Sequence, residues 1–427
     1  MPLRSRSDEA PNQGLSRLLR WRPGSRGDTP PPPSKPQAKD DIDVLASRII
    51  LPSQIVTDEE MARALHQDRG LKLARQDLWN ELSEKIKFAD TSRLPTPGGE
   101  CAALLMAFGA RSDVVAAAED ALYDGAVPDP AGFAALEEIL EEYPDAYPCA
   151  LIVALAHIDI AWAWRNMAGQ SDPVSAAEYA SDHIERAATI LSAFDGTDLN
   201  APSLIAARCA LFAACDKRGP RVAQEYEKLI ALDPTSHRHM RALGRHVLPG
   251  YAGGLEVLEV SARRVAVQTQ EIWGSGAYAW VYLDALALNR RALNLLDVEF
   301  FVEGLHDIVA RKQDQHIVNL LTAFCAITMA PKQDDHELPD HFAQNRAAVH
   351  DNLDWLLEYH LSELHPLIWS QTLLSPGHGP QLPSRRALVA KGKQTALRII
   401  ATRFAPLIED GSSISFSDSG IKHVPSG

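Results

Sequence analysis

The sequence predicts an all-α protein in which antiparallel helix pairs stack side by side. Alanine is frequent, aromatic residues make up only 7% of the chain, and long alternations of β-branched residues are absent, which favours closely packed helices over sheets. Apolar residues recur at helical spacing in segments of roughly 12 to 20 residues. Because the links between these segments are short, neighbouring helices must run antiparallel.

Chain length and cysteine usage indicate a large protein without disulfides. With 427 residues, the chain exceeds the size at which one compact core stops growing. Its five cysteines lie singly in apolar helical contexts, as reduced buried thiols do. The most apolar run, Ala150 to Ala163, is interrupted by His157 and Asp159, so we expect a buried helix and no transmembrane segment. No secretory signal is visible, which favours a cytoplasmic location.

The net charge of −14 is unevenly distributed along the chain. Residues 1–39 hold eight Lys/Arg against three acids, and residues 384–404 hold six Lys/Arg and no acid. The remainder is strongly acidic, and residues 112–164 contain no Lys or Arg at all. Because an acidic body cannot neutralise phosphates, we expect it to bind no nucleic acid, whereas the basic ends suit weak contacts with a membrane or a partner.

The N-terminal part of the chain divides into a tail and a helical unit. Residues 1–40 include Pro30 to Pro33 in a row and little apolar surface, so they predict a disordered basic tail. Residues 41–97 are expected to form an N-terminal helical unit. Within it, Thr57 and Glu60 have the spacing of a capping box, which predicts that a helix begins there.

Residues 98–290 are punctuated regularly by Asx and proline residues. Asp129-Pro130 and Asp172-Pro173 each supply an N-cap followed by proline in the first turn, and Pro202 follows Asn200 in a similar arrangement. A further helix is expected after Gly254. The apolar period predicts helices at about residues 100–109, 113–124, 130–143, 148–168, 173–194, 202–217 and 255–272.

Residues 203–236 resemble a tetratricopeptide repeat. The second helix of this unit contains Tyr226 and closes on Leu232-Asp233-Pro234, which is similar to the aromatic residue and the Leu-Asp-Pro ending of that family. Val222 and Leu229 stand where the family has small residues, which puts the close packing of the helix pair in question. The resemblance implies a tetratricopeptide-like α-solenoid, with at least three stacked units, that serves as an interaction scaffold.

Residues 291–410 are expected to form a C-terminal helical region. Helices are predicted at about residues 297–312, 315–330, 339–361 and 385–408. The last of them carries an apolar stripe on one face, as does a helix that caps the open end of a stack. The Ser/Gly-rich composition of residues 411–427 predicts a second disordered tail.

Two segments carry aromatic and polar side chains that are candidates for a partner-binding groove: the predicted helix at about 148–168, and the stretch that follows Trp273, where the glycines predict a tight corner between helices. In the first helix, Trp162 and Arg165 are suited to anchor an acidic or aromatic ligand. Aromatic stripes in helices more often belong to the core, so burial is the competing interpretation. The candidate residues are His157, Asp159, Trp162, Arg165, Tyr278, Trp280, Tyr282 and Asp284.

Neither the histidines nor the lysines form a recognised metal or phosphate motif. His237, His239 and His246 lie close together in the sequence, but HExxH and paired Cys/His ligands are missing. Lys391-Gly-Lys393 lacks the upstream glycine and the strand of a P-loop. We therefore expect no metal, no cofactor and no catalytic residue.

These observations predict a noncatalytic scaffold that binds a protein or peptide partner in a helical groove. Two alternatives stay open. An all-α enzyme would gather His157, Asp159 and Arg165 in a closed pocket, and a structural subunit of a membrane-associated assembly would reach the membrane through its basic ends. A deep pocket around these side chains favours the enzyme, and an open groove favours the scaffold.

Overall fold

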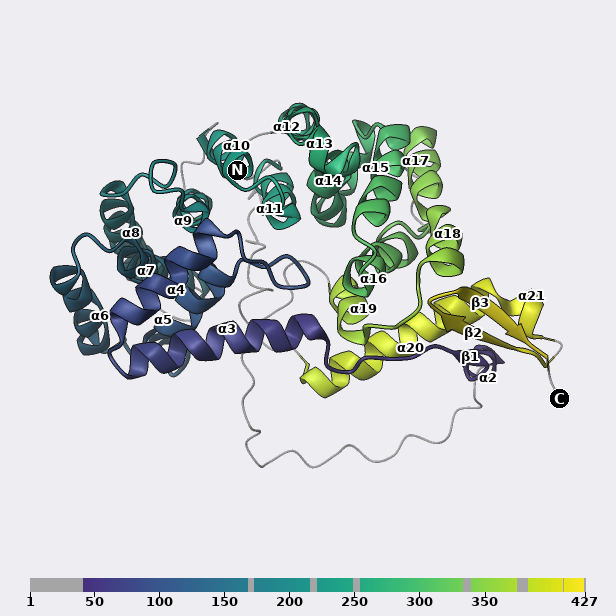
Figure 1. Cartoon of the computed structure of the whole chain (residues 1–427), viewed down its shortest axis with the longest axis horizontal. Helices are drawn as coiled ribbons and strands as arrows, with labels where there is room; N and C mark the ends of the chain where they lie inside the picture. Colours follow the sequence, from purple (N-terminus) through teal and green to yellow (C-terminus); the bar gives the residue numbers. More distant parts are fainter. Residues whose placement is uncertain are drawn as a thin grey trace, which may run out of the picture. The chain divides into compact units, whose positions relative to one another are not determined.

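The computed structural model describes residues 41–167, 173–215, 221–248, 254–332, 339–374, 383–409 and 411–425. These residues are mostly α-helical, with a small three-stranded sheet near the C-terminus (Figure 1). The all-α prediction is therefore confirmed for the helices and wrong for the sheet. The tail expected at residues 1–40 lies outside the described residues.

The chain divides into two compact units. One comprises residues 1–55 together with 312–427, and the other comprises residues 56–311. The finer limits expected at residues 97 and 290 stay predictions.

The unit of residues 56–311 is built from helices joined by short links. Its elements are α3 (Asp58–Arg75), α4 (Trp79–Thr91), α5 (Ala102–Tyr123), α6 (Pro130–Glu142), α7 (Tyr147–Met167), α8 (Pro173–Ser192), α9 (Pro202–Ala214), α10 (Arg221–Leu232), α11 (His237–His246), α12 (Leu255–Gln268), α13 (Gln270–Trp273), α14 (Gly276–Leu288), the 3-10 helix η1 (Arg290–Asn294) and α15 (Val298–Arg311).

Two helices begin at the residues where the sequence predicts a capping side chain. The capping box of α3 is confirmed, because the Glu60 N–H donates to the Thr57 hydroxyl and the Thr57 N–H donates to the Glu60 carboxylate. Asp129 caps α6 by accepting from the N–H of Ala131 at 2.9 Å. Asp172, the third expected cap, lies outside the described residues.

The region of α5 differs from the expected pair of short helices. Residues 102–123 form one helix, because the link at Ala110 to Asp113 contains neither Gly nor Pro. Conversely, the single helix expected at 255–272 is divided at Thr269 into α12 and α13.

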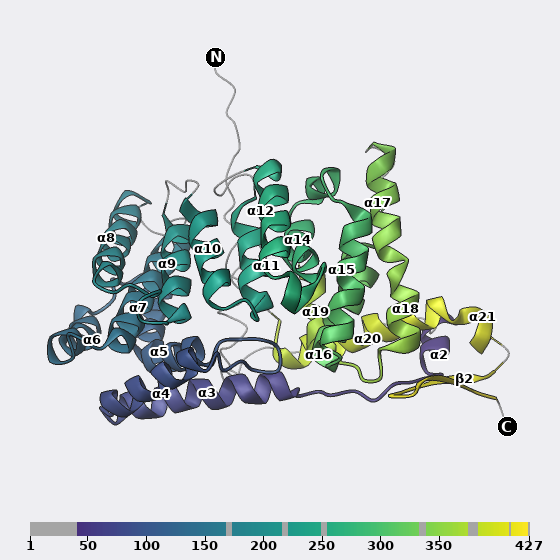
Figure 2. The same cartoon turned by 45° about the horizontal axis from the view of Figure 1, so that its top comes forward.

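Helices that follow one another in the chain contact one another. α7 contacts α8 and α9, α10 contacts α9 and α11, and α14 contacts α12 and α15. Figures 1 and 2 show α9, α10, α11, α14 and α15 following one another across this unit, with α7 between α8 and α9. Close packing also joins helices that are not chain neighbours, because α3 packs on α5, α5 on α7 and α11 on α14.

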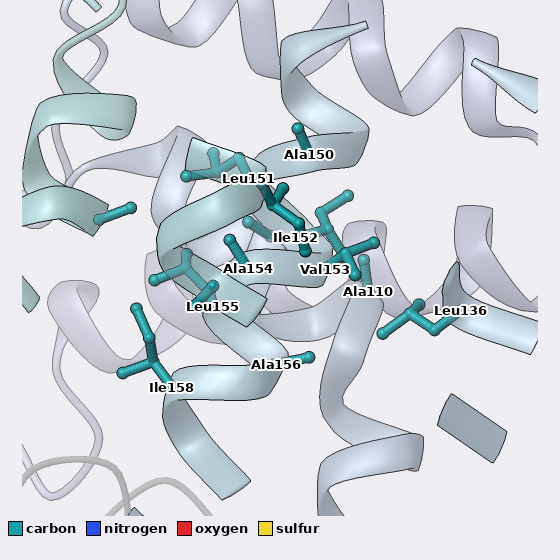
Figure 3. Packing of buried hydrophobic residues seen from close by; sticks show 14 of the residues in the cluster. Ala110, Leu136, Ala150, Leu151, Ile152, Val153, Ala154, Leu155, Ala156 and Ile158 are labelled. Atoms are coloured by element: carbon teal, nitrogen blue, oxygen red, sulfur yellow. The ribbon is translucent and has the colours of Figure 1, made fainter. Parts of the chain in front are cut away.

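One hydrophobic cluster of this unit surrounds α7. Figure 3 shows Ala150 to Ile158 of this helix packed with Ala110 of α5 and Leu136 of α6. By length and composition, Tyr147–Asn166 is apolar enough to cross a membrane, and it is the one such helix among the residues described. Length and apolar composition alone do not distinguish a membrane-spanning helix from a core helix. In this structure 89% of the apolar window is buried inside the protein, as in a core helix.

A glycine brings α11 unusually close to α14. A Cβ atom at Gly244 would lie 1.8 Å from the carbonyl oxygen of Val281, so no larger residue fits without moving the helices apart. Beside this contact, Arg241 and Arg245 of α11 pair with Asp284 of α14.

The other unit contains shorter helices. They are α2 (Asp41–Ala46), α16 (Gln315–Ala323), the π-helix η2 (Phe324–Thr328), α17 (Asp340–His350), α18 (Asn352–Tyr359), α19 (Pro366–Leu373), α20 (Arg385–Arg403) and α21 (Ala405–Ile408). The helix expected at 385–408 is thus present as α20 and α21, and its capping role stays a prediction.

The disordered tail expected at residues 411–427 is a wrong prediction over its described part. β2 (Ser413–Ser417) pairs antiparallel with β3 (Gly420–Val424) and parallel with β1 (Ile49–Ile50). The reason is strict alternation: Ile414 and Phe416 are buried, while the three serines that alternate with them along the strand are not. Phe416 meets Phe404 edge-on, which ties the sheet to the end of α20.

Candidate functional site

His157 is buried in α7 and joins three helices. Its Nε2 atom lies 2.8 Å from Glu137 Oε1 on α6, and its Nδ1 atom lies 2.8 Å from Nδ1 of His183 on α8. Arg186 donates two hydrogen bonds to the same Glu137 carboxylate, both of 2.8 Å. The ring of Phe133 contacts both imidazoles. His157 therefore belongs to a hydrogen-bonded chain that connects α6, α7 and α8.

The other candidate residues of α7 have partners of their own. Asp159 accepts from Arg111 Nε of α5 at 2.7 Å. Arg165 lies over the ring of Trp162 at 5.4 Å and donates to the carbonyl of Ala214. The contacts thus divide His157, Asp159 and Arg165 among different partners, and they do not gather the three around one point.

Tyr278 and Tyr282 of α14 share a single carboxylate. Both hydroxyls donate to Glu259 Oε2 of α12, at 2.8 Å and 2.6 Å, and the Tyr278 hydroxyl also accepts from the N–H of Asp297. Both rings are fully buried. These tyrosines join α12, α14 and the start of α15 from inside, and a partner does not reach them in this conformation.

Trp280 is likewise fully buried, with an exposed fraction of 0%. Its ring stacks on His237 of α11 at 4.4 Å and meets Trp273 edge-on. Its indole N–H makes no hydrogen bond within the described part of the chain. Trp280 therefore serves the packing of α11 on α14.

Asp284, unlike the other candidate residues of α14, forms ion pairs with arginines of a neighbouring helix. It accepts two hydrogen bonds from Arg241 of α11, of 3.1 Å and 2.7 Å, and lies 3.8 Å from Nε of Arg245. Burial alone would raise the pKa of Asp284, but the charges of Arg241 and Arg245 outweigh burial and lower it. Asp284 is thus ionised at neutral pH.

These contacts belong to a larger group that we call the arginine cluster. Glu100, which precedes α5, accepts from Arg63 of α3 at 2.8 Å and pairs with Arg238 of α11 at 2.9 Å. Arg238 also donates to the carbonyl of Gly98 and lies 4.0 Å from Glu59. The cluster consists of Arg63, Arg238, Arg241 and Arg245 with the carboxylates of Glu59, Glu100 and Asp284.

The electrostatics of the cluster show that its members act on one another. Burial would raise the pKa of Glu100, but Arg238 and Arg63 lower it, with further contributions from Arg241 and Arg245. Burial lowers the pKa of Arg238, yet an arginine remains protonated at neutral pH. Four positive charges therefore face three negative ones.

Several guanidinium N–H groups of the cluster have no acceptor. Arg63 makes one hydrogen bond and its buried Nε makes none, counting the residues that the structure describes. Arg245 makes no hydrogen bond to any described residue, and its Nε atom is buried. Since an arginine has five N–H donors in a rigid fork, the cluster keeps unused capacity for an oxyanion.

The cluster is a site that the sequence analysis missed, although part of its signal was present. Arg238, Arg241 and Arg245 have the i, i+3, i+7 spacing of one helix face. The histidines of the same segment, His237 and His239, drew attention to metal binding instead. Across the described ranges, His, Cys, Asp and Glu residues form no group of three or more that could hold a metal ion.

Comparison with known proteins adds no family to this description. Neither a protein-family model, nor a curated protein, nor a solved structure matches the chain.

Proposed function

We propose that residues 56–311 form a tetratricopeptide-like interaction scaffold that binds a protein partner against the arginine cluster. The observation that carries the proposal is the cluster itself: a net positive, partly buried group with unused donors in a chain whose net charge is −14. A local charge of opposite sign to the surrounding protein attracts a complementary surface and fixes its register.

The packing of the helices supports the scaffold part of the proposal. α9 and α10 pair along the segment that resembles the repeat, and Val222, Tyr226 and Leu229 are all buried there. Their neighbours on either side contact them in chain order. A stack of this kind presents one helix of each pair on a continuous face, which is how such proteins bind extended partners.

The two alternative functions receive less support. An enzyme needs a nucleophile or base and its partners around one point, whereas His157, Asp159 and Arg165 bond in different directions. For a membrane-associated subunit, the basic tail that would carry the contact lies outside the described residues. The scaffold is therefore the function to test first.

The test is affinity capture with the full chain. Wild-type protein, an Arg241→Gln/Arg245→Gln variant and an Arg264→Gln control are used as baits in native lysate, and retained proteins are quantified by mass spectrometry. Arg264 is an exposed residue of α12 that pairs with Glu227, away from the cluster. We expect proteins retained by wild type and control to fall about tenfold or more with the double variant. Equal recovery by all three baits, with unchanged circular dichroism, would reject the arginine cluster as the contact surface.

A further inference from the structure

We infer that the ligand of the arginine cluster is an acidic segment of the partner, and that Arg245 binds one of its Asp or Glu carboxylates. This inference rests on the proposed function and deepens it, because it assigns the chemistry of the contact. The inference also distinguishes the arginines that already donate hydrogen bonds within the protein from Arg245, which does not.

The division follows from the hydrogen bonds. Arg241 donates hydrogen bonds from both Nε and Nη2 to one oxygen of Asp284. Arg238 donates to the carbonyl of Gly98 and pairs with Glu100. Arg245 makes an ion pair with Asp284 Oδ2 at 3.8 Å, which is too long for a hydrogen bond, and it donates no hydrogen bond to any other described residue. Its side chain is 25% exposed although its Nε atom is buried, so a ligand would meet a partly exposed arginine.

The position of Arg245 in the fold makes its guanidinium group suitable as a binding site for a carboxylate. It lies one turn beyond Arg241 on α11, and the close approach at Gly244 holds the helix backbone against α14. The guanidinium is therefore positioned by the fold before a ligand arrives, so less entropy is lost when it binds.

The charge count of the cluster favours a carboxylate over a phosphate. With four arginines and three carboxylates, one additional single charge makes the group neutral. A phosphate group, which carries close to two negative charges at pH 7, would leave excess negative charge beside Asp284 and Glu100. Carboxylates also match the planar guanidinium fork in shape.

Asp284 has an opposing role, since it competes with the ligand for the same arginine. Replacing Asp284 by the isosteric Asn keeps the volume and one acceptor oxygen but removes the charge. Arg245 then faces the ligand alone, so the change should strengthen binding of an acidic segment. A residue that only maintained the fold would weaken binding when replaced.

The experiment measures fluorescence anisotropy of a fluorescein-labelled hexaglutamate peptide added to the full chain at physiological ionic strength. We expect Arg245→Gln to raise the Kd about tenfold, Asp284→Asn to lower it about threefold, and Arg264→Gln to leave it within about twofold. Binding should also weaken as salt is raised, because the contact is charged. A Kd for Arg245→Gln equal to that of the control, or weaker binding by Asp284→Asn with unchanged circular dichroism, overturns the inference.

A second peptide tests the ligand class. A hexapeptide with one phosphoserine among neutral residues should bind more weakly than the matched hexapeptide with one glutamate at that position, and tighter binding of the phosphopeptide overturns the carboxylate assignment. The outcome is separable from the proposed function. If lysate capture depends on Arg241 and Arg245 but hexaglutamate does not bind, the proposed scaffold function stands and the acidic ligand is wrong. If hexaglutamate binds but the lysate yields no captured protein, the acidic ligand stands and the proposed scaffold function is wrong.

Discussion

The Nδ1 atoms of His157 and His183 lie 2.8 Å apart, so the two rings share one proton between them. Glu137 accepts from Nε2 of His157, which leaves the Nδ1 of His157 as an acceptor and the Nδ1 of His183 as the donor. Both rings are then neutral. A second proton would either place two N–H groups face to face, on Nδ1 of His157, or put a positive charge in this largely buried site, on Nε2 of His183, and in both cases it weakens the contact between α7 and α8.

Acid should therefore weaken this part of the protein. Burial, followed by the neighbouring His157, lowers the pKa of His183 from 6.5 to about 4, against small opposing effects of Asp182 and Glu137. Because the folded pKa lies below the unfolded one, the stabilisation is complete above pH 6.5 and is lost as the pH falls towards 4. We expect about 1 to 2 kcal/mol, less than the full pKa difference implies because the ring is partly exposed.

The variant that tests this is His183→Asn, whose amide nitrogen can still donate to His157 but does not titrate. Its urea midpoint should change less than that of wild type between pH 6.5 and pH 4.5. His306→Asn, at an exposed position of α15, serves as the matched control and should keep the wild-type slope. An unchanged slope in His183→Asn would mean that the histidine pair does not sense pH.

Asp90 of α4 gives a pH dependence of the opposite sign. Burial raises the pKa of this carboxyl from 3.8 to about 6, against the hydrogen bonds from Ser203 and Tyr147. The stabilisation by its protonated form is therefore present below pH 3.8 and lost as the pH rises towards 6. Asp90→Asn should remove this slope in urea unfolding, whereas Asp90→Ala should cost about 2 to 3 kcal/mol at pH 7, because the N–H of Ser203 loses its acceptor. Equal effects of both substitutions would contradict this role.

Trp280 and Trp162 should respond very differently to truncation. Trp280→Ala removes a fully buried ring between α11 and α14 and should lower the free energy of unfolding by about 3 to 5 kcal/mol. Trp162 is half-buried under Arg165, so Trp162→Ala should cost about 1 kcal/mol. Chemical denaturation of both variants checks the difference. Similar losses would show that the burial of Trp280 contributes little.

The small sheet should stabilise the unit to which it belongs. Phe416→Ser replaces a buried ring against Phe404 by a hydroxyl, and we expect a loss of about 3 kcal/mol. Ser415→Thr, at a half-exposed position of the same strand, should be neutral and serves as control. Hydrogen exchange of residues 49–50 and 413–424 reports the effect locally; rapid exchange already in wild type would argue against a stable sheet.

The sequence predicts helices well wherever local chemistry determines them. Thr57 with Glu60, and Asp129 with Pro130, fix helix starts through side chains only a few residues away. The sheet was missed because Ser and Gly dominate residues 411–427, and that composition hid the alternation of Ile414 and Phe416. The partner strand, Ile49–Ile50, lies far away in the sequence, so no local pattern indicates the pairing.

The candidate site was only partly predictable for the same reason. Asp284 could be selected from its own helix, but its partners, Arg241 and Arg245, come from α11. Tyr278 and Trp280 look like a binding surface in the sequence because burial is set by neighbouring helices that the segment itself does not reveal. The sequence does not show which helices hydrogen-bond to each other, nor which arginine N–H groups have no acceptor; both follow only from the three-dimensional structure.

The most direct measurement of the central claim is the reactivity of individual arginines with phenylglyoxal, mapped by mass spectrometry. Arg241 and Arg245 are similarly buried, with side chains 17% and 25% exposed, but only Arg241 is hydrogen-bonded to Asp284. Arg245 should therefore react faster than Arg241, and hexaglutamate should protect Arg245 while leaving Arg264 unaffected. An Arg245 that reacts no faster than Arg241, or that hexaglutamate fails to protect, would contradict the account.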